Sequence, residues 1–410
     1  MDLLPEKIAQ LIPKERNDLK LHEIEEEIVG KVIRYMIDHF VDFLFQDYKN
    51  DHEGKSDVEE YINEVQAILD ITWEKLNTGY WKDVNLSWRF LYSYATLFKI
   101  LFVLIRKKDN YLNEAVKVCD YGIIMGAPIL DNLLKKIASV LANDLKPVKD
   151  DDCEIIHEHK SKKRTHHKTI IIQDKEIVRV KCPSLEKFKS SYMDLKQPVI
   201  IEDAIDYWPA LSTNKWSIDY LLEIAGCRLV PIEIGNSYTD KLWSQKLVTL
   251  EEFIKNYILK STNEIGYLAQ HNLFDQIQEL RNDIAIPTYC SLAESEDEVD
   301  INAWFGPEGT ISPLHHDPKH NLLAQVMGEK YVRLYDEENT PMLYPHPSKL
   351  LDNTSQVDVE NPDLNKFPKF SSAQYQECIL KSGEVLYIPR KCWHYVRSLS
   401  VSFSVSFWWH

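Results

Sequence analysis

The stretch from Trp304 to the C-terminus constrains the fold most, because short apolar segments alternate there with turn residues. The segments read HNLLAQVMG, EKYVRLYD, ECILKSGEVLYIP and WHYVRSLSVSFSVSFWW. Turn residues follow or separate them at Gly328, Gly383 and Pro389. Short strands at such regular spacing are typical of an all-β barrel or sandwich. The sequence therefore predicts a β domain at the C-terminal end of the chain.

The sequence before Trp304 divides into a helical part and a mixed part. Over residues 1–145 apolar residues recur at intervals of three and four, for example in 62–69 and 91–101, which predicts a helical bundle or a short α-solenoid. From residue 169 onward, segments rich in Ile and Val, TIIIQDKEIVRV and QPVIIEDAI, predict short strands. Helical stretches are expected among them near 217–225 and 250–259.

A charged segment separates the two parts. It reads DDDCEIIHEHKSKKRTHHK and has almost nothing to bury, so a solvated linker is expected over 149–168. Its basic run at 160–164 is a candidate nuclear-import signal. We therefore expect a helical domain over 1–148, this linker, and a catalytic domain over 169–410 whose β core begins at about residue 265.

Composition excludes several classes of protein. Only 12 of 410 residues are glycine and no two form a G-x-G pair, so neither the dinucleotide fingerprint nor a P-loop is present. The net charge of −16 disfavours nucleic acid as a direct ligand and suits a basic partner. Seven scattered cysteines without C-x-x-C favour free thiols in a reducing compartment.

Neither a signal peptide nor a membrane span is expected. The N-terminus mixes charges into its apolar positions, so it has no apolar signal-peptide core. The most apolar stretch, residues 90–105, is interrupted by Lys99 and is shorter than the roughly 18 residues of a membrane span. We therefore expect a soluble intracellular protein that makes no membrane contact.

The segment PLHHDP offers a candidate metal site. On a strand, residues two apart point the same way, so His315 and Asp317 share a face and His316 points to the other. One imidazole and one carboxylate are two thirds of the facial triad that binds Fe(II) with open positions. His394, in CWHY, is the candidate for the third ligand. Zinc is the chemical alternative, and the nearby His316 and His320 leave the choice of ligands open.

Lys330 is a second unusual residue. In KYVRLY the alternation places it on the same strand face as the apolar Val332 and Leu334. A lysine facing a core is costly without an anion, and the carboxylate of a small acid is a suitable partner, with Asn321 one strand earlier to assist. The alternative is that Lys330 lies at a strand end and extends to solvent.

Several runs of residues together resemble a known family. WFGP at 304–307, TISPLHHDP, QVMGEKYVRLY, LYPH and IPRKCWHYVRSLSVSFSVSFWW are similar to JmjC-domain 2-oxoglutarate oxygenases, within which the match is to the arginyl-hydroxylase type. The resemblance covers roughly residues 170–410. It implies an α+β chain, with an N-terminal helical region followed by a double-stranded β-helix of the jelly-roll, cupin-like kind and flanking helices.

The resemblance also assigns residues to the cofactors. His315, Asp317 and His394 fall on the positions of the iron ligands. It implies five residues around 2-oxoglutarate, namely Lys330, which would pair with the distal carboxylate, and Tyr267, Ser312, Asn321 and Trp408. The implied cofactors are Fe(II), 2-oxoglutarate as co-substrate and O2, with ascorbate as a reductant.

The substrate site is expected around Glu233, which lies among apolar strand residues in VPIEIG. A carboxylate with aromatic walls can hold a guanidinium by a bidentate pair and by stacking. Tyr238 and Trp243 lie in the segments that flank it. The resemblance places Glu233, Trp304 and Gln270 near the target side chain.

These residues favour hydroxylation of an arginine side chain in a basic segment of a protein substrate such as a histone tail, and the resemblance implies C-3 as the position. Three alternatives stay open: demethylation of methyl-lysine in histones, arginine-directed cleavage of histone tails by a metal-activated water, and a non-catalytic chromatin adaptor. We further expect a monomer located in the nucleus and in the cytoplasm, with no direct contact to nucleic acid.

Overall fold

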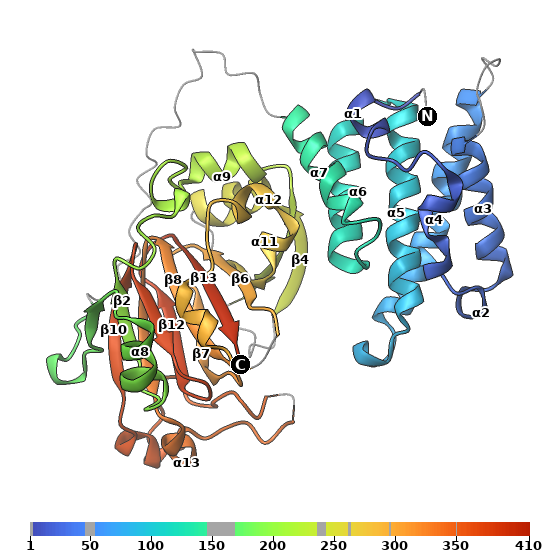
Figure 1. The fold of residues 1–410 in the computed structure, drawn as a ribbon. Coiled ribbons are helices and arrows are strands. Elements are labelled where there is room, and N and C mark those ends of the chain that lie inside the picture. Colours follow the sequence, from blue (N-terminus) through green and yellow to red (C-terminus); the bar gives the residue numbers. More distant parts are fainter. Residues whose placement is uncertain are drawn as a thin grey trace. The chain divides into compact units, whose positions relative to one another are not determined.

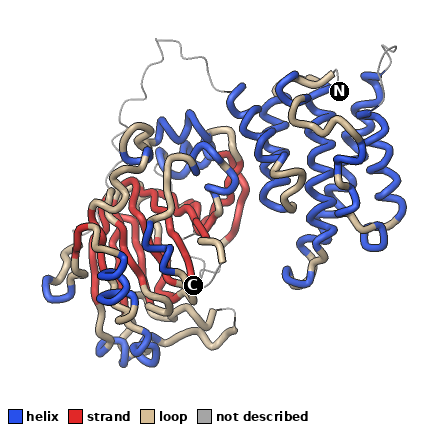
Figure 2. Tube along the Cα trace, viewed as in Figure 1, coloured by secondary structure: helices blue, strands red, loops and turns tan. Residues whose placement is uncertain are grey.

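In the computed structural model, the described residues are 3–45, 54–145, 169–235, 243–260, 264–294, 297–349 and 351–410. The expected linker at 149–168, its basic run and Tyr238 lie outside these ranges. The chain forms two compact units. The first comprises Met1–Cys153, Glu223–Leu229 and Gln276–Gln278, and the second comprises Glu154–Leu222, Val230–Asp275 and Glu279–His410. Figure 2 shows helices throughout the first unit and the strands concentrated in the second.

The first unit is helical, as the apolar periodicity predicts (Figure 1). Its α-helices are α1 (Glu6–Ala9), α2 (Glu26–Val29), α3 (Lys31–Phe45), α4 (Gly54–Asn77), α5 (Leu86–Arg106), α6 (Tyr111–Met125) and α7 (Leu133–Asp144). Helix α5 packs against α4 on one side and α6 on the other, and α6 packs against α7. These helices share one apolar core.

Helix α5 is the central element of this unit. The side chain of Asn85 accepts the backbone N–H of Ser87 and so caps its N-terminus. By length and composition α5 could cross a membrane, because the helix has 21 residues and is longer than the apolar stretch at 90–105 considered above. However, 78% of its most apolar window is buried inside the unit, which is the arrangement of a core helix.

The second unit is built on two sheets. Its strands are β1 (Arg179–Lys181), β2 (Val199–Glu202), β3 (Leu229–Ile234), β4 (Ser244–Thr249), β5 (Gly266–His271), β6 (Asp300–Gly306), β7 (Ile311–His316), β8 (His320–Met327), β9 (Glu329–Tyr335), β10 (Gln376–Lys381), β11 (Val385–Ile388), β12 (Trp393–Ser398) and β13 (Ser402–Trp409). One sheet has nine strands in the order β1-β2-β11-β8-β13-β6-β5-β3-β4. The other has four, in the order β10-β9-β12-β7.

Short helices flank these sheets. They are α8 (Leu185–Phe188), α9 (Ile218–Ala225), α10 (Leu250–Phe253), α11 (Leu273–Gln276), α12 (Gln278–Arg281) and α13 (Thr340–Leu343). Helix α9 and the helical stretch beginning with α10 lie where the sequence predicts helix. The predicted α+β class, helices first and strands after, is confirmed.

Two predicted strands differ in the structure. The segment WHYVRSLSVSFSVSFWW forms β12 in the four-stranded sheet and β13 in the nine-stranded sheet, because the chain turns after Ser398 and crosses between sheets. In TIIIQDKEIVRV only Arg179–Lys181 is a strand, and a 3-10 turn forms at Gln173–Lys175.

Strand β13 lies between β6 and β8 in the nine-stranded sheet, and the side chains on both of its faces are buried except for the half-buried Trp408. The serine face is satisfied by side-chain hydrogen bonds. Ser404 donates to Gln325 at 2.6 Å, and Ser406 accepts the indole N–H of Trp304 at 2.9 Å. Period-2 alternation of Ser with Val and Phe therefore marks a central strand here.

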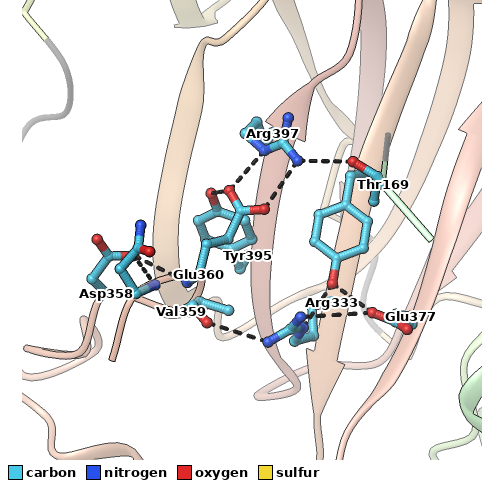
Figure 3. Close-up of polar contacts among 10 residues, drawn as sticks. Thr169, Arg333, Asp358, Val359, Glu360, Glu377, Tyr395 and Arg397 are labelled. Carbon is cyan, nitrogen blue, oxygen red and sulfur yellow. Dashed lines mark hydrogen bonds and ion pairs between the residues drawn. The ribbon is translucent and has the colours of Figure 1, made fainter. Parts of the chain in front are cut away.

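A polar cluster occupies the outer face of the four-stranded sheet (Figure 3). We call it the outer cluster, and it consists of Tyr331, Arg333, Glu360, Glu377, Tyr395 and Arg397. Glu360 accepts the hydroxyl of Tyr395 at 2.7 Å and two N–H groups of Arg397 at 2.7 and 3.0 Å. Glu377 accepts the hydroxyl of Tyr331 at 2.5 Å. The cluster thereby joins β9, β10 and β12 to the segment that contains Glu360.

Replacing Glu377 tests whether this cluster stabilises the sheet. Its side chain is 2% exposed, and it also accepts the backbone N–H of Ile172 at 2.8 Å. Glu377→Gln removes the charge from these hydrogen bonds, so we expect the free energy of unfolding to fall by about 2 kcal/mol. The measurement is the urea midpoint at unchanged slope. The exposed Glu329→Gln is the matched control, and equal midpoints for the two variants would contradict the role of the cluster.

Candidate active site

The candidate metal centre is formed where β7 meets β12. In the register of these antiparallel strands His394 lies directly opposite His315, and Asp317 follows β7 immediately. The potential ligand atoms of the three residues all lie within 4.8 Å of one another. Nε2 of His394 is 3.5 Å from Oδ2 of Asp317, and the two imidazole rings are 4.1 Å apart between centroids.

Backbone carbonyls orient both imidazoles. Nδ1 of His315 lies 2.7 Å from the carbonyl of Pro313, and Nδ1 of His394 lies 3.0 Å from that of Cys392. A carbonyl only accepts, so each Nδ1 carries the proton and each Nε2 keeps its lone pair for a metal. Burial, with a smaller contribution from His315, lowers the pKa of His394 to about 4. His394 is therefore neutral at physiological pH, as a metal ligand must be.

The carboxylate of Asp317 completes a donor set that fits Fe(II). Its Oδ2 is buried and has no hydrogen-bond partner among the residues that the structure describes. A buried carboxylate oxygen without a partner is costly unless a cation neutralises it. Two neutral imidazoles and one carboxylate on one side of the ion are the donors of the facial triad. Zn²⁺ also accepts such donors, so the ligand types alone do not distinguish the metals.

The two neighbouring histidines do not join this group. The ring of His316 packs edge-on against Trp393, with centroids 4.7 Å apart, on the opposite strand face. His320 is buried, and its Nδ1 lies 2.8 Å from the hydroxyl of Tyr387. The structure thus brings together the three residues of the expected triad and leaves His316 and His320 outside it.

A pocket between the two sheets surrounds the metal centre. It contains all five of the residues expected around 2-oxoglutarate, Tyr267, Ser312, Asn321, Lys330 and Trp408, as well as Trp304. Sequence reasoning missed its apolar walls, Leu323, Ile388 and Val396. Strand alternation could have found two of them, since Leu323 is two positions after Asn321 and Val396 is two positions after His394.

Lys330 gives the pocket its positive charge. It is 1% exposed, and its Nζ donates to the hydroxyl of Tyr267 at 3.3 Å. Burial lowers its pKa to about 7. The indole N–H of Trp408 and Oδ1 of Asn321, which line the same pocket, have no hydrogen-bond partners within the described chain. A buried cation with unpaired polar groups beside it is suited to bind the carboxylate of a small acid.

The residues expected at the substrate site have different positions. Glu233 on β3 pairs with Tyr267 on β5, so its side chain shares a sheet face with a pocket residue. Burial raises the pKa of Glu233, and the nearby indole of Trp243 partly offsets this, although its N–H lacks hydrogen-bond geometry to any described acceptor. Gln270 is exposed on β5, with φ +46°, and is not part of the pocket lining.

Comparison with known proteins places this geometry in a family. A model described as "Cupin-like domain" matches residues 185–410, and one described as "KDM8-like, N-terminal ARM repeats" matches residues 55–154. The chain is 54% identical over 351 residues to lysine-specific demethylase 8 of Danio rerio, covering 84% of this chain and 86% of the relative.

Two further relatives have names of the same family. The chain is 46% identical to lysine-specific demethylase 8 of Xenopus tropicalis, covering 84% of this chain and 87% of that protein. It is 36% identical to Jumonji C domain-containing protein 5 of Drosophila melanogaster, covering 98% of both chains.

Fold, site and relatives together define a cupin-fold JmjC protein of the 2-oxoglutarate-dependent oxygenase class, whose domains generally bind Fe(II) and 2-oxoglutarate. The match of the helical unit to the ARM-repeat model distinguishes one group within this class. The chain belongs to the lysine-specific demethylase 8-like family of JmjC proteins. The expected resemblance and the jelly-roll, cupin-like fold are confirmed.

The pKa of Lys330 leads to a prediction for 2-oxoglutarate binding. At pH 8 the free protein holds this amine mostly neutral, whereas a bound carboxylate favours the ammonium form, so binding takes up a proton. From pH 7 to 9 the affinity should therefore fall by up to about tenfold per pH unit. Calorimetry at pH 8 in buffers of different ionisation enthalpy measures the uptake directly.

Two variants serve as the comparison. Lys330→Met should bind 2-oxoglutarate weakly and without proton uptake, whereas the exposed Lys381→Met should match the wild type. Proton release, or an affinity that rises with pH, would show that Lys330 does not hold the co-substrate.

Proposed function

We propose that this protein is an Fe(II)- and 2-oxoglutarate-dependent oxygenase that hydroxylates an arginine side chain, at C-3, in a basic segment of a protein substrate. Bound Fe(II) and 2-oxoglutarate, with O2, supply the oxidant for C–H hydroxylation. The residues of this chain hold the reactants and exclude water. His315, Asp317 and His394 would bind the metal, and Lys330 with Tyr267 would bind the acid.

The observation that supports arginine is the position of Glu233. Its carboxylate is partly desolvated and lies on the strand beside Tyr267, next to the pocket rather than in it. A guanidinium offers two parallel N–H donors that match a carboxylate, and desolvation strengthens such a pair. Trp304 in the pocket wall supplies an aromatic surface for the planar group.

Demethylation of methyl-lysine is the second candidate, because the relatives from Danio rerio and Xenopus tropicalis are named lysine-specific demethylases. That reaction would use the same metal and co-substrate. A methylated ammonium is best recognised by an aromatic cage, and it cannot form the bidentate pair that a lone carboxylate offers. The position of Glu233 therefore favours arginine as the target.

Partners and location are also proposals. A chain with net charge −16 suits a basic peptide such as a histone tail and disfavours direct contact with nucleic acid. The basic run at 160–164 supports a nuclear location with a cytoplasmic pool. We propose a monomer, with ascorbate as a reductant that keeps the iron in its ferrous state.

Glu233→Gln tests the proposal. The amide keeps the shape of the carboxylate but loses the charge-assisted pair, so kcat/KM for an arginine peptide should fall by about 100-fold or more. Mass spectrometry should show the addition of one oxygen atom to arginine by the wild type, only when 2-oxoglutarate is present. Binding of 2-oxoglutarate should not change in the variant.

Exposed Glu251→Gln is the matched control and should retain full activity. Loss of a methyl group from a methyl-lysine peptide with release of formaldehyde, and no oxygen added to arginine, would support the demethylase instead. Cleavage of the peptide without 2-oxoglutarate would overturn the oxygenase reaction altogether.

A further inference from the structure

The helical unit contains a cavity of about 380 Å³ that the proposed function does not use. Three helices form it: α4, α5 and α6. Residues at helical spacing face it, including Asp70 and Trp73 from α4, Thr96 and Lys99 from α5, and Tyr121 from α6. We call it the α4–α6 cavity. Its volume lies within the range of about 300–1,000 Å³ that is typical of small-ligand sites.

The α5 side of the cavity carries unused hydrogen-bond donors. The hydroxyl of Thr96 is fully buried and has no partner among the described residues. Lys99 is half-buried, and among those same residues its ammonium donates only to Oε1 of Gln66. An ammonium has three N–H groups. Burial lowers the pKa of Lys99, and the carboxylates of Glu114 and Asp70 offset only part of this effect.

Aromatic side chains form other parts of the lining. Trp73 is 53% exposed and Tyr121 is 40% exposed, while Tyr92 beside them is buried. Large rings with this much exposed surface, gathered around one cavity, offer apolar contact area to a ligand. A ligand of this cavity would therefore carry an apolar or aromatic group.

The charges around the cavity select the other part of the ligand. Aromatic rings with Asp70 alone would suit a cation, but Lys99 in the same cavity repels one. Asp70 is exposed and already accepts the side-chain N–H of Gln66 at 2.6 Å. Because an exposed charge is screened more than a half-buried one, Asp70 offsets only part of the attraction that Lys99 exerts on an anion in the cavity. A carboxylate beside an apolar group satisfies both Lys99 and Thr96.

We propose that the α4–α6 cavity binds a carboxylate that carries an aromatic or aliphatic group beside it. A peptide offers this chemistry in two ways, as a C-terminal apolar residue or as an acidic side chain next to an apolar one. The helical unit would then be a second recognition site of the protein, with a preference opposite in charge to that of Glu233.

Ligand-detected NMR on the full chain tests this binding. The probes are N-acetyl-phenylalanine, its amide, and acetyl-Glu-Phe-amide, which moves the carboxylate to a side chain. N-acetyl-phenylalanine should bind at least about tenfold more tightly than its amide, because only the acid pairs with Lys99. Stronger binding of either carboxylate probe identifies which peptide group is the source. This comparison needs no variant.

Variants locate the site. Lys99→Met should weaken binding of the acid by about tenfold or more, and Thr96→Val by a smaller factor. The exposed Lys117→Met on α6 and the active-site Lys330→Met should both bind like the wild type. Equal affinities for acid and amide, no effect of Lys99→Met in a folded variant, or tighter binding of N-acetyl-trimethyl-lysine amide would overturn the proposal.

Discussion

The antiparallel pairing of β7 with β12 is the constraint on which the site depends. It sets His394 opposite His315, and a one-residue slip would turn one imidazole out of the pocket. Asp317 is held beside them because its carbonyl accepts the backbone N–H of Lys391 at 2.7 Å, which ties the end of β7 to the approach to β12. Backbone hydrogen bonds thus bring together three ligands from two distant segments.

Strand alternation gives the four-stranded sheet two different polar faces. Lys330 and His394 point into the pocket, where burial disfavours their charged forms. Their neighbours Tyr331 and Tyr395 point outward, where Glu377 and Glu360 accept their hydroxyls. The residues of the outer cluster satisfy one another, whereas the pocket keeps groups without a partner among the described residues, such as Oδ2 of Asp317, that bound ligands can satisfy. Stability and function therefore come from opposite sides of the same strands.

Much of this could be predicted from local pattern. Helical spacing over residues 1–145, short strands after Trp304 and the inward position of Lys330 all follow from periods of 3.6 and 2, and the structure has them. The choice of His394 over His316 and His320 could not follow from spacing, because it depends on a register between strands far apart in sequence. The resemblance to JmjC proteins supplied that choice.

Other features could not be predicted from the sequence for similar reasons. The division of the last apolar run into β12 and β13 is invisible locally, since alternation continues across the turn between two sheets. In the sequence, Lys99 only interrupts an apolar stretch, but in the structure it lines a cavity formed by three helices. In each case the missing information is which segments pack together, and no window of the sequence contains it.

The most direct test of the central claim is metal binding by single-histidine variants, followed by electron paramagnetic resonance with Mn(II). Among the described residues the structure predicts one site, and binding there should be weakened by more than about 100-fold in His315→Ala and in His394→Ala, since even the outer-shell partners of a metal are worth about 10–100-fold. His316→Ala should bind like the wild type. Loss of binding in His316→Ala with retention in His315→Ala would contradict the register of β7 and with it the whole account of the site.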